Sequence, residues 1–413
     1  MSVFIVFGVV GYFWLTTAKI LGTPIDLAFG PEDARFPGTM GPLLGAEFSR
    51  GNSVKTMING DNFFPVMLEA IRDAKKTVSL ETYIWSSGKV SDQFIDALSD
   101  RAKHGVVVNV LADGMGTLKF SHDEERRMKD AGVNFIIYGR KNWWDVKPNI
   151  NHRTHRKILV IDGRVGFTGG MCIDDHWLGS ADSEKVWRET MVKFEGPAVL
   201  ELQATFASNW LQTTGILLIG PDYFPKPEAA GDSVANVYKS GPSENPENAR
   251  VAYMMAIASA RKSIKIANAY FVPDDLAIEM LLRAKKRGVR IQVIVPAIND
   301  SKIGRAASRS RWGPLLQAGV EFYRYMPAMY HPKVMIVDDV FVTVGSVNFD
   351  NRSFSINDEV ALNVIDRDVA RDHVRAFEHD LKFSEPYSFS EYDNRGAFQK
   401  MLDQAAGLLR SQL

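Results

Sequence analysis

The sequence predicts an α/β fold made of two copies of one unit, related by a pseudo-twofold axis, each with a mixed sheet flanked by helices. Strand and helix patterns alternate along the chain, which is typical of such units. The order of these patterns is repeated in the two halves. A signature, His-x-Lys-x4-Asp with a later glycine pair, also occurs twice, as His155, Lys157, Asp162 with Gly169-Gly170, and as His331, Lys333, Asp338 with Gly345-Ser346. Chance does not account for two such copies in a chain with 8 histidines.

The repeat extends well beyond the signature. In each half a helix ends at a basic turn, and strands then alternate with helices until the signature hairpin. The matching stretches are 70–78 and 256–264, 101–106 and 284–289, and 131–135 and 318–322. We therefore expect strands at 78–84 and 106–112 in the first half, and at 264–271 and 289–295 in the second.

Each signature reads as a β-hairpin. The apolar runs 158–161 and 334–337 are followed by Asp-Gly or Asp-Asp, which favour a turn. Side chains alternate between faces in a strand, so each histidine shares a face with its lysine. Asp162 and Asp338 have the opposite parity. Two interpretations stay open for them: formers or buried partners of the turn, or catalytic groups.

The chain divides into four segments by composition. Residues 1–22 are predicted to be a membrane anchor, and 23–50, rich in glycine and proline, a tether. A proline-rich connector at 220–227 separates the first unit, 51–225, from the second, 226–413.

The predicted anchor starts with 18 residues that carry no charged side chain, ending at Ala18 before Lys19. This is the lower limit for spanning the bilayer. A cleaved signal peptide is the alternative, but the basic start is missing. Lys19, Arg35 and Arg50 favour a cytoplasmic catalytic domain at the cell membrane.

Charge and cysteine content limit the function. The 49 basic and 49 acidic residues cancel, so no net positive field attracts nucleic acid, and we expect no nucleic-acid partner. Cys172 is the only cysteine, which excludes an intrachain disulfide and a cysteine-based metal cluster.

From about residue 51 to 381 the chain resembles the phospholipase D superfamily, and within it the bacterial cardiolipin synthases. Besides the doubled signature, the resemblance rests on the strings 80–85, Trp187-Arg188-Glu189-Thr190, 268–274, and 345–359 with Asn348. The resemblance implies that Glu189 and Glu359 hold the histidines and that Ser346 and Asn348 contact phosphate. The matching positions in the first copy are Gly170 and Cys172. Cys172 departs from the pattern, because a thiol is a poor substitute for an amide.

The chemistry follows from the charge of a phosphodiester. A site must neutralise the nonbridging oxygens and also supply a nucleophile and an acid. A neutral imidazole attacks phosphorus, the opposite imidazolium protonates the leaving alcohol, and Lys157 and Lys333 hold the oxygens. No metal or other cofactor is required. The resemblance makes His155 the nucleophile, and we expect the two histidines to differ in protonation near neutral pH.

We therefore predict a cardiolipin synthase of the bacterial inner membrane that joins two phosphatidylglycerols and releases glycerol. The alternatives are a phospholipase D that hydrolyses lipids to phosphatidic acid, a nuclease of the superfamily, and a non-catalytic scaffold that binds anionic headgroups. The partners are a phospholipid and the bilayer, and the oligomeric state is left open.

Three secondary features are also noted. A basic, twin-tryptophan loop at 140–144 is predicted either to enter lipid headgroups or to pack in the core. His152 and His176 are expected to be surface or supporting residues. Four cations before Trp312 either line a headgroup entrance or form a solvated helix face, and these are Lys302, Arg305, Arg309 and Arg311.

Overall fold

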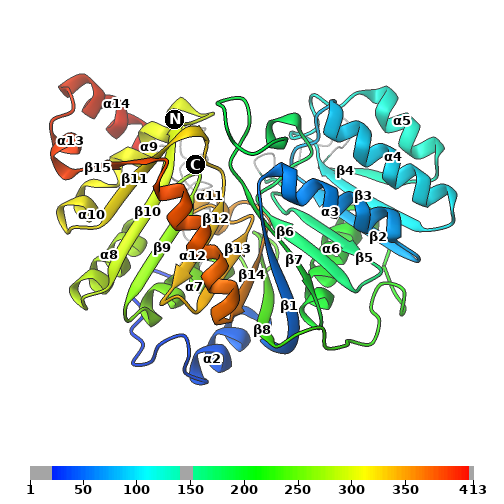
Figure 1. The fold of residues 1–413 in the computed structure, drawn as a ribbon, viewed down its shortest axis with the longest axis horizontal. Coiled ribbons are helices and arrows are strands. Elements are labelled where there is room, and N and C mark those ends of the chain that lie inside the picture. Colours follow the sequence, from blue (N-terminus) through cyan, green and yellow to red (C-terminus); the bar gives the residue numbers. More distant parts are fainter. Residues whose placement is uncertain (1–20, 140–151, 409–413) are drawn as a thin grey trace, which may run out of the picture.

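A computed structural model describes residues 21–139 and 152–408 of the chain (Figure 1). The predicted α/β fold with a mixed sheet and flanking helices is confirmed, because the strands join in one sheet of 15, in the order β15-β11-β10-β9-β12-β13-β14-β8-β1-β7-β6-β5-β2-β3-β4. Almost all of the predicted anchor, and the loop at 140–144, lie outside the described residues. Among the described helices, none is long and apolar enough to cross a membrane.

The first half runs from β1 to α6. Strands β2, β3 and β4 are parallel, whereas β5, β6 and β7 continue the sheet antiparallel to their neighbours. The elements are β1 (Ser49–Ile58), α3 (Gly60–Asp73), β2 (Thr77–Thr82), α4 (Lys89–Lys103), β3 (Val107–Asp113), α5 (His122–Asp130), β4 (Asn134–Tyr138), β5 (Ile158–Ile161), β6 (Val165–Gly169), the 3-10 turn η1 (Asp175–Trp177), β7 (Thr190–Glu195) and α6 (Ala198–Thr214).

The second half repeats this order. Strands β9, β10 and β11 are parallel, and β12, β13 and β14 are antiparallel to their neighbours. The elements are β8 (Ser233–Ser240), α7 (Asn248–Ser259), β9 (Ser263–Asn268), α8 (Asp275–Lys286), β10 (Arg290–Ile298), α9 (Lys302–Ser310), α10 (Gly313–Gln317), β11 (Glu321–Met329), β12 (Lys333–Val337), β13 (Phe341–Gly345), α11 (Asn351–Ser355), β14 (Glu359–Ile365), α12 (Arg367–Leu381), β15 (Ser384–Tyr387), α13 (Phe389–Asp393) and α14 (Ala397–Gly407).

The two halves meet where β8 lies beside β1, at the centre of Figure 1. The strand order reads the same outward from this seam in both directions, apart from β15 at one edge, as a pseudo-twofold relation requires. The β1–β8 pairing is short and irregular, with Ser49 opposite Ala235 and Asn52 opposite Ser233. Hydrogen bonds between β1 and β8 therefore account for only part of the contact between the halves.

A shared hydrophobic core supplies the rest of the contact between the halves. Side chains alternate along β5, so that Leu159 packs into the core of the first half and Val160 into a cluster on the opposite face. This second cluster takes residues from both halves, including Phe206 of α6 and Phe377 of α12. Because both halves bury apolar area in it, we expect them to unfold together.

The segment predicted to be a tether contains a packed helix. Residues 35–44 form α2 (Arg35–Leu44), and its Phe36, Met40 and Leu44 recur on one face and are buried. Phe36 meets Phe341 of β13 edge-on, with ring centroids 5.4 Å apart. This helix was not predicted from the sequence, because the many glycines and prolines of the segment favour a loop and obscure the helical spacing of its apolar residues. Residues 35–44 therefore belong to the core of the second half.

Both signature aspartates lie in the hairpin turns. Asp162 and Asp338 adopt φ values of 54° and 53°, a left-handed conformation that aspartate tolerates. The carboxylate of Asp162 accepts hydrogen bonds from the amides of residues 75–77, at 2.7–2.9 Å. Asp338 does the same for residues 261–263. A strand rises about 3.3 Å per residue, so each aspartate lies roughly 20 Å along the chain from its histidine, as the turn-forming interpretation expects.

Asp338→Asn tests this interpretation. The amide retains one acceptor oxygen and loses the charge, so we expect the free energy of unfolding to fall by about 2–4 kcal/mol. Turnover by the folded protein should persist. Asp339→Asn is the matched control, because Asp339 also has a left-handed backbone but is exposed and, among the described residues, pairs with Lys265 on the surface. Thermal and urea unfolding would measure the free energy of unfolding of both variants. Lost turnover at unchanged stability in Asp338→Asn would instead support a catalytic role.

Candidate active site

The two histidines precede the β5–β6 and β12–β13 hairpins of opposite halves, and short bridges between the halves fix their backbones. Thr154 forms a parallel bridge with Asp358, and Arg188 forms one with Tyr330. The amide of His155 donates to the carbonyl of Asp358 at 2.9 Å, and the equivalent bond from His331 to Arg188 is also 2.9 Å. Each histidine is thus held beside the residue that precedes a glutamate of the other half.

The glutamates therefore pair with the histidines crosswise. Nδ1 of His155 lies 2.9 and 3.0 Å from the two carboxylate oxygens of Glu359. Nδ1 of His331 lies 2.6 Å from Oε2 of Glu189. Both glutamates are fully buried. A carboxylate at Nδ1 fixes the proton there, so Nε2 of each ring carries the lone pair.

The electrostatics favour neutral imidazoles in this ligand-free site. Burial lowers the pKa of His155 to about 4, against the opposing charge of Glu359. Burial and the neighbouring Lys333 lower the pKa of His331 to about 4 as well. Although burial alone disfavours a charged carboxylate, the histidine and lysine neighbours hold the pKa of Glu189 below its ordinary value. Burial thus favours the neutral form of both rings alike, and the expected difference in protonation between them stays a prediction.

The two lysines lie next to their histidines but make different contacts. Each ammonium donates to the carbonyl of its own histidine at 2.6 Å. Lys333 also reaches Nε2 of His331, at 3.1 Å. Lys157 instead lies over the ring of Tyr83, 5.3 Å from its centroid. Burial lowers the pKa of Lys333 to about 8. A cation thus hydrogen-bonds to one of the two imidazoles.

The support of the glutamates also differs between the halves. Glu359 accepts hydrogen bonds from the hydroxyls of Ser346 and Ser353. Ser346 is fully buried and bonds to this carboxylate, so it supports the pair of Glu359 with His155; its implied contact with phosphate stays a prediction. Glu189 accepts from the indole N–H of Trp177 at 3.1 Å. Sequence reasoning missed Trp177 and Ser353, since nothing in their spacing relates them to a carboxylate.

Gly170, predicted to bind substrate, is explained by packing. A β-carbon at this position would lie 2.5 and 2.6 Å from the carboxylate oxygens of Glu189. Any side chain there would displace the carboxylate or be displaced by it. A buried carboxylate needs a hydrogen-bond donor. Ser346 is this donor for Glu359, and Trp177 is the donor for Glu189.

A cleft of about 450 Å³ opens onto both histidines. Trp177 and Trp187 flank the ring of His331, with centroids 5.4 and 5.0 Å away, and Tyr83 lies 5.2 Å from the ring of His155. Asn348 also lines the cleft, and its buried Oδ1 accepts no hydrogen bond from the described residues. Oδ1 is an acceptor, so the predicted contact with a phosphate oxygen would fall to the Nδ2 donor of the same amide and stays a prediction.

Cys172, the equivalent position of the first half, lines the same cleft but is 1 % exposed and packs within the core of that half. The described part of the chain also contains no group of three or more His, Cys, Asp or Glu side chains arranged to hold a metal ion.

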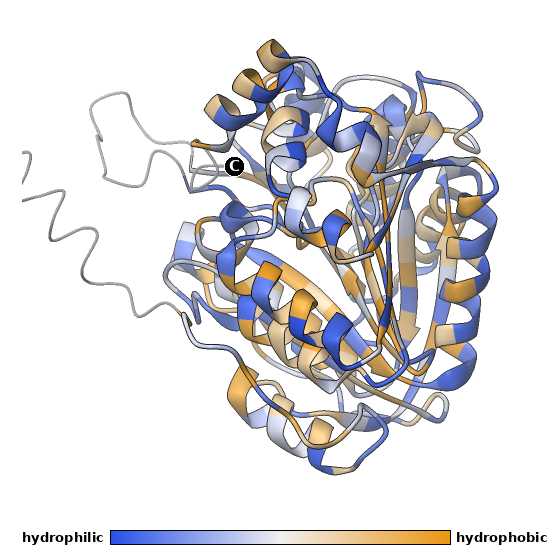
Figure 2. Ribbon diagram, turned by 90° about the vertical axis from the view of Figure 1, so that its left-hand side faces the viewer, coloured by the Kyte–Doolittle hydropathy of each residue, from blue (hydrophilic) through white to orange (hydrophobic). Residues whose placement is uncertain are grey.

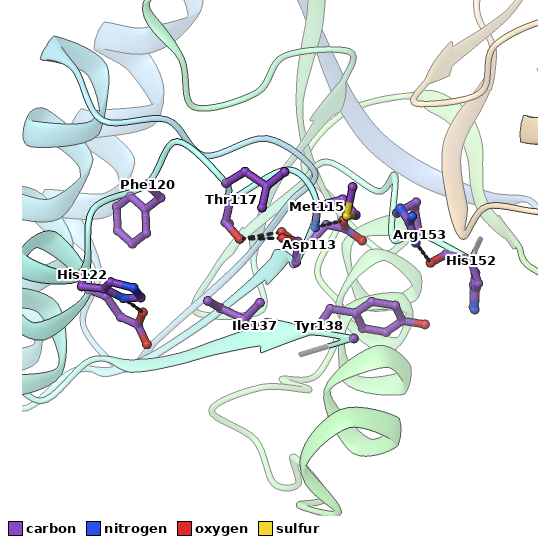
Figure 3. Close-up of a pocket in the computed structure, with 13 residues that line it drawn as sticks. Asp113, Met115, Thr117, Phe120, His122, Ile137, Tyr138, His152 and Arg153 are labelled. Atoms are coloured by element: carbon purple, nitrogen blue, oxygen red, sulfur yellow. Dashed lines mark hydrogen bonds and ion pairs between the residues drawn. The ribbon is translucent and has the colours of Figure 1, made fainter. Parts of the chain in front are cut away.

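Supporting residues lie behind the cleft. His152 and Tyr138 reach the two carboxylate oxygens of Asp358, at 2.9 and 3.0 Å. His176, by contrast, is half-exposed and pairs with Asp174. Figure 3 shows a second cavity, of about 530 Å³, with His152 and Arg153 at one end and Phe120 and His122 at the other. Arg153 lines both cavities, so the two adjoin.

The four cations before Trp312 differ in their contacts. Arg309 forms a two-pronged pair with the buried Asp403, and Arg311 pairs with Asp275. Gly304, at the start of α9, lines the cleft, whereas Lys302 and Arg305 are exposed. Only the start of this helix therefore reaches the cleft.

Comparison with known proteins identifies the family. The sequence matches the family described as "Cardiolipin synthase, PLD-like domain" over residues 67–210 and 253–381. Cardiolipin synthase 1 of Bacillus cereus is 33% identical over 359 residues, which is 85% of this chain and 70% of the relative. Cardiolipin synthase 2 of Bacillus anthracis is 35% identical over 369 residues, 89% of this chain and 72% of the relative. The chain belongs to the cardiolipin synthase family of the phospholipase D superfamily, as its motifs predicted.

Solved structures share the fold. Phosphatidylserine synthase of Haemophilus influenzae superposes with a TM-score of 0.66 at 14% identity, covering 92% of this chain and 100% of that one. Polyphosphate kinase of Porphyromonas gingivalis superposes with a TM-score of 0.52 at 16% identity. The superposition covers 94% of this chain and 57% of the kinase. At these identities the likeness concerns the fold alone.

Removing either carboxylate charge tests the crossed pairs. Glu189→Gln and Glu359→Gln should each lower kcat by about 10²–10⁴-fold, because the amide no longer fixes the reactive tautomer. Substrate KM should change little. Glu201→Gln is the control, since Glu201 is another largely buried glutamate, bonded to the amide of Val237 and outside the site. Equal losses in all three variants would point to a general defect in folding.

The neutral imidazoles predict a titration. With folded-state pKa values near 4, against an ordinary value of 6.5, both rings should stay neutral until the pH falls towards 4. The unfolded chain binds these protons first, so this contribution to stability is lost as the pH falls from about 6.5 to 4. Histidine ring NMR, assigned with single His→Ala variants, would measure the values. A ring at 155 or 331 that titrates near 6.5 would contradict this prediction.

Proposed function

We propose that this protein is a cardiolipin synthase that transfers a phosphatidyl group from one phosphatidylglycerol to a second one. The crossed pairs of His155 with Glu359 and His331 with Glu189 carry the proposal, because they fix both imidazoles at one cleft with Nε2 as the reactive nitrogen of each ring. The family supports the same function, since relatives at 33% and 35% identity are named cardiolipin synthases.

In the first step Nε2 of His155 attacks phosphorus, and the bond from phosphorus to the headgroup oxygen breaks. The protonated Nε2 of His331 gives its proton to that oxygen, so that glycerol leaves and a phosphatidyl-histidine remains. In the second step the neutral His331 takes the proton from a hydroxyl of the second phosphatidylglycerol. The hydroxyl oxygen attacks phosphorus, the phosphorus–nitrogen bond breaks, and cardiolipin forms.

The lysine contacts support this assignment of roles. A bound phosphodiester adds a negative charge between the two rings, which favours one imidazolium. Lys333 donates a hydrogen bond to Nε2 of His331 at 3.1 Å and so occupies the lone pair that a nucleophile would use. Lys157 has no such contact in the described structure and lies over Tyr83. His331 is thus suited to be the acid, and His155 the nucleophile.

Lys157, Lys333 and Asn348 are proposed to hold the nonbridging oxygens. Two buried ammonium groups offset the charge that accumulates in the transition state, which explains why the site tolerates the loss of an amide at Cys172. The proposed steps use only these side chains.

We place the reaction at the bacterial cell membrane, with the catalytic halves on the cytoplasmic side. The apolar run before Lys19 and the lipid substrate support this location. The two units, 51–225 and 226–413, are proposed to act as one site, because each provides the carboxylate for the other's histidine.

Incubation of the purified protein with phosphatidylglycerol and a chelator, followed by mass spectrometry, tests the proposal. Cardiolipin and glycerol should appear in equal amounts, and His155→Ala and His331→Ala should each abolish turnover while keeping the melting temperature. Phosphatidic acid as the sole product would make water the acceptor and the protein a hydrolase. Substantial cardiolipin from either variant would contradict the paired-histidine mechanism.

A further inference from the structure

The last described helix, α14, is inverted with respect to the usual amphipathic pattern. Its inner face is polar, because the buried Asp403 pairs with Arg309 at 2.8 Å and accepts from Gln399 at 2.8 Å. Arg395 pairs with the same carboxylate. The close approach of Gly407 to Ser310 completes the packing of α14 on α9.

The outer face of α14 is apolar. Phe398 is 69 %, Met401 57 %, Leu402 43 % and Leu408 83 % exposed. These positions recur at helical spacing and form one stripe, so the exposure belongs to a continuous face and is not a set of isolated residues. A water-soluble surface helix shows the reverse arrangement. Such a stripe marks a contact with an apolar partner.

We propose that the stripe formed by Phe398, Met401, Leu402 and Leu408 is the surface by which the catalytic halves dock on an anionic lipid leaflet. We call it the α14 stripe. The inference rests on the proposed function, and it adds the surface through which the site reaches its lipid substrate.

The neighbouring helix supports a lipid partner. On α9, against which α14 packs, Ile303 is 55 % exposed, and Lys302 and Arg305 are exposed beside it. Apolar side chains flanked by cations fit the boundary between acyl chains and anionic headgroups. A symmetric dimer through this surface would instead bring the same cations of two copies together.

The position of the stripe relative to the cleft also supports a lipid partner. Ser301 and Gly304, at the start of α9, line the cleft that holds both histidines. Helix α9 therefore connects the cleft, at its start, with α14, which packs on Arg309 and Ser310 at its end. Figure 2 views the molecule from the side that carries α14 in Figure 1, where hydrophobic segments lie among the surface helices. A leaflet on the α14 stripe would lie near the cleft mouth.

A triple variant tests the proposal: Phe398→Gln, Met401→Gln and Leu402→Gln in the full chain. Turnover of phosphatidylglycerol in vesicles should fall about tenfold, through a higher apparent KM, because the helix loses its apolar contact. Turnover of monomeric dihexanoyl-phosphatidylglycerol should be unchanged, which also shows that the variant folds.

The matched control replaces three exposed apolar residues of the other half, Ile216→Gln, Leu217→Gln and Ile219→Gln, which are 57 %, 61 % and 69 % exposed. This variant should keep both activities. Equal losses on vesicles in the two triple variants, or no loss in the α14 variant, would overturn the assignment. If the unaltered protein turns over neither substrate, the proposed function fails instead.

Spin labels locate the contact directly. A nitroxide at Met401→Cys should become more accessible to oxygen and less accessible to a water-soluble nickel complex when phosphatidylglycerol vesicles are added, and a label at Leu217→Cys should not. The native Cys172 is 1 % exposed and does not compete for label. A label at 401 that is shielded before vesicles are added would mean that another part of the chain or a second copy covers the stripe, and would refute lipid docking there.

Discussion

The crossed pairing of histidine and glutamate is the interaction on which the rest of the site depends. Each imidazole comes from one half and its carboxylate from the other, at 2.6–3.0 Å. Neither half therefore contains an oriented nucleophile by itself. The short bridges at Thr154–Asp358 and Arg188–Tyr330, and the core shared by α6 and α12, serve to keep these pairs in register. Formation of the fold and assembly of the site are thus one event.

The proposed mechanism requires the two halves to differ at the site, because one ring attacks while the other protonates the leaving group. The two imidazole rings have similar pKa values and similar carboxylate partners, and they differ in the other side chains that surround them. Lys333 hydrogen-bonds to the imidazole of His331, whereas Lys157 lies over the ring of Tyr83. Tryptophans flank His331, whereas Tyr83 flanks His155. Glu189 accepts a hydrogen bond from Trp177, whereas serines donate to Glu359. These contacts make the surroundings of the two rings unequal, although the pKa values of both rings lie near 4.

The sequence predicted the fold class, the two hairpins and the two histidines that meet at the cleft, because strand alternation and a doubled motif are local patterns. It did not predict that Glu189 serves His331 and Glu359 serves His155, since partner choice depends on how two halves dock. It also did not predict that Ser346 bonds to Glu359, or that Gly170 leaves room for the carboxylate of Glu189, because both depend on contacts between strands. Helix α2 was hidden by glycine and proline, and the inverted face of α14 appears only when the buried Asp403 is seen.

The most direct test of the account is to trap the covalent intermediate in the His331→Ala variant. A phosphodiester with a p-nitrophenol leaving group needs no acid, so His155 should still attack and the intermediate should accumulate. Peptide mass spectrometry after a basic quench should find the adduct on His155 and none in the His155→Ala variant. An adduct on His331 in the His155→Ala variant, with none on His155 in the other, would contradict the assignment of roles.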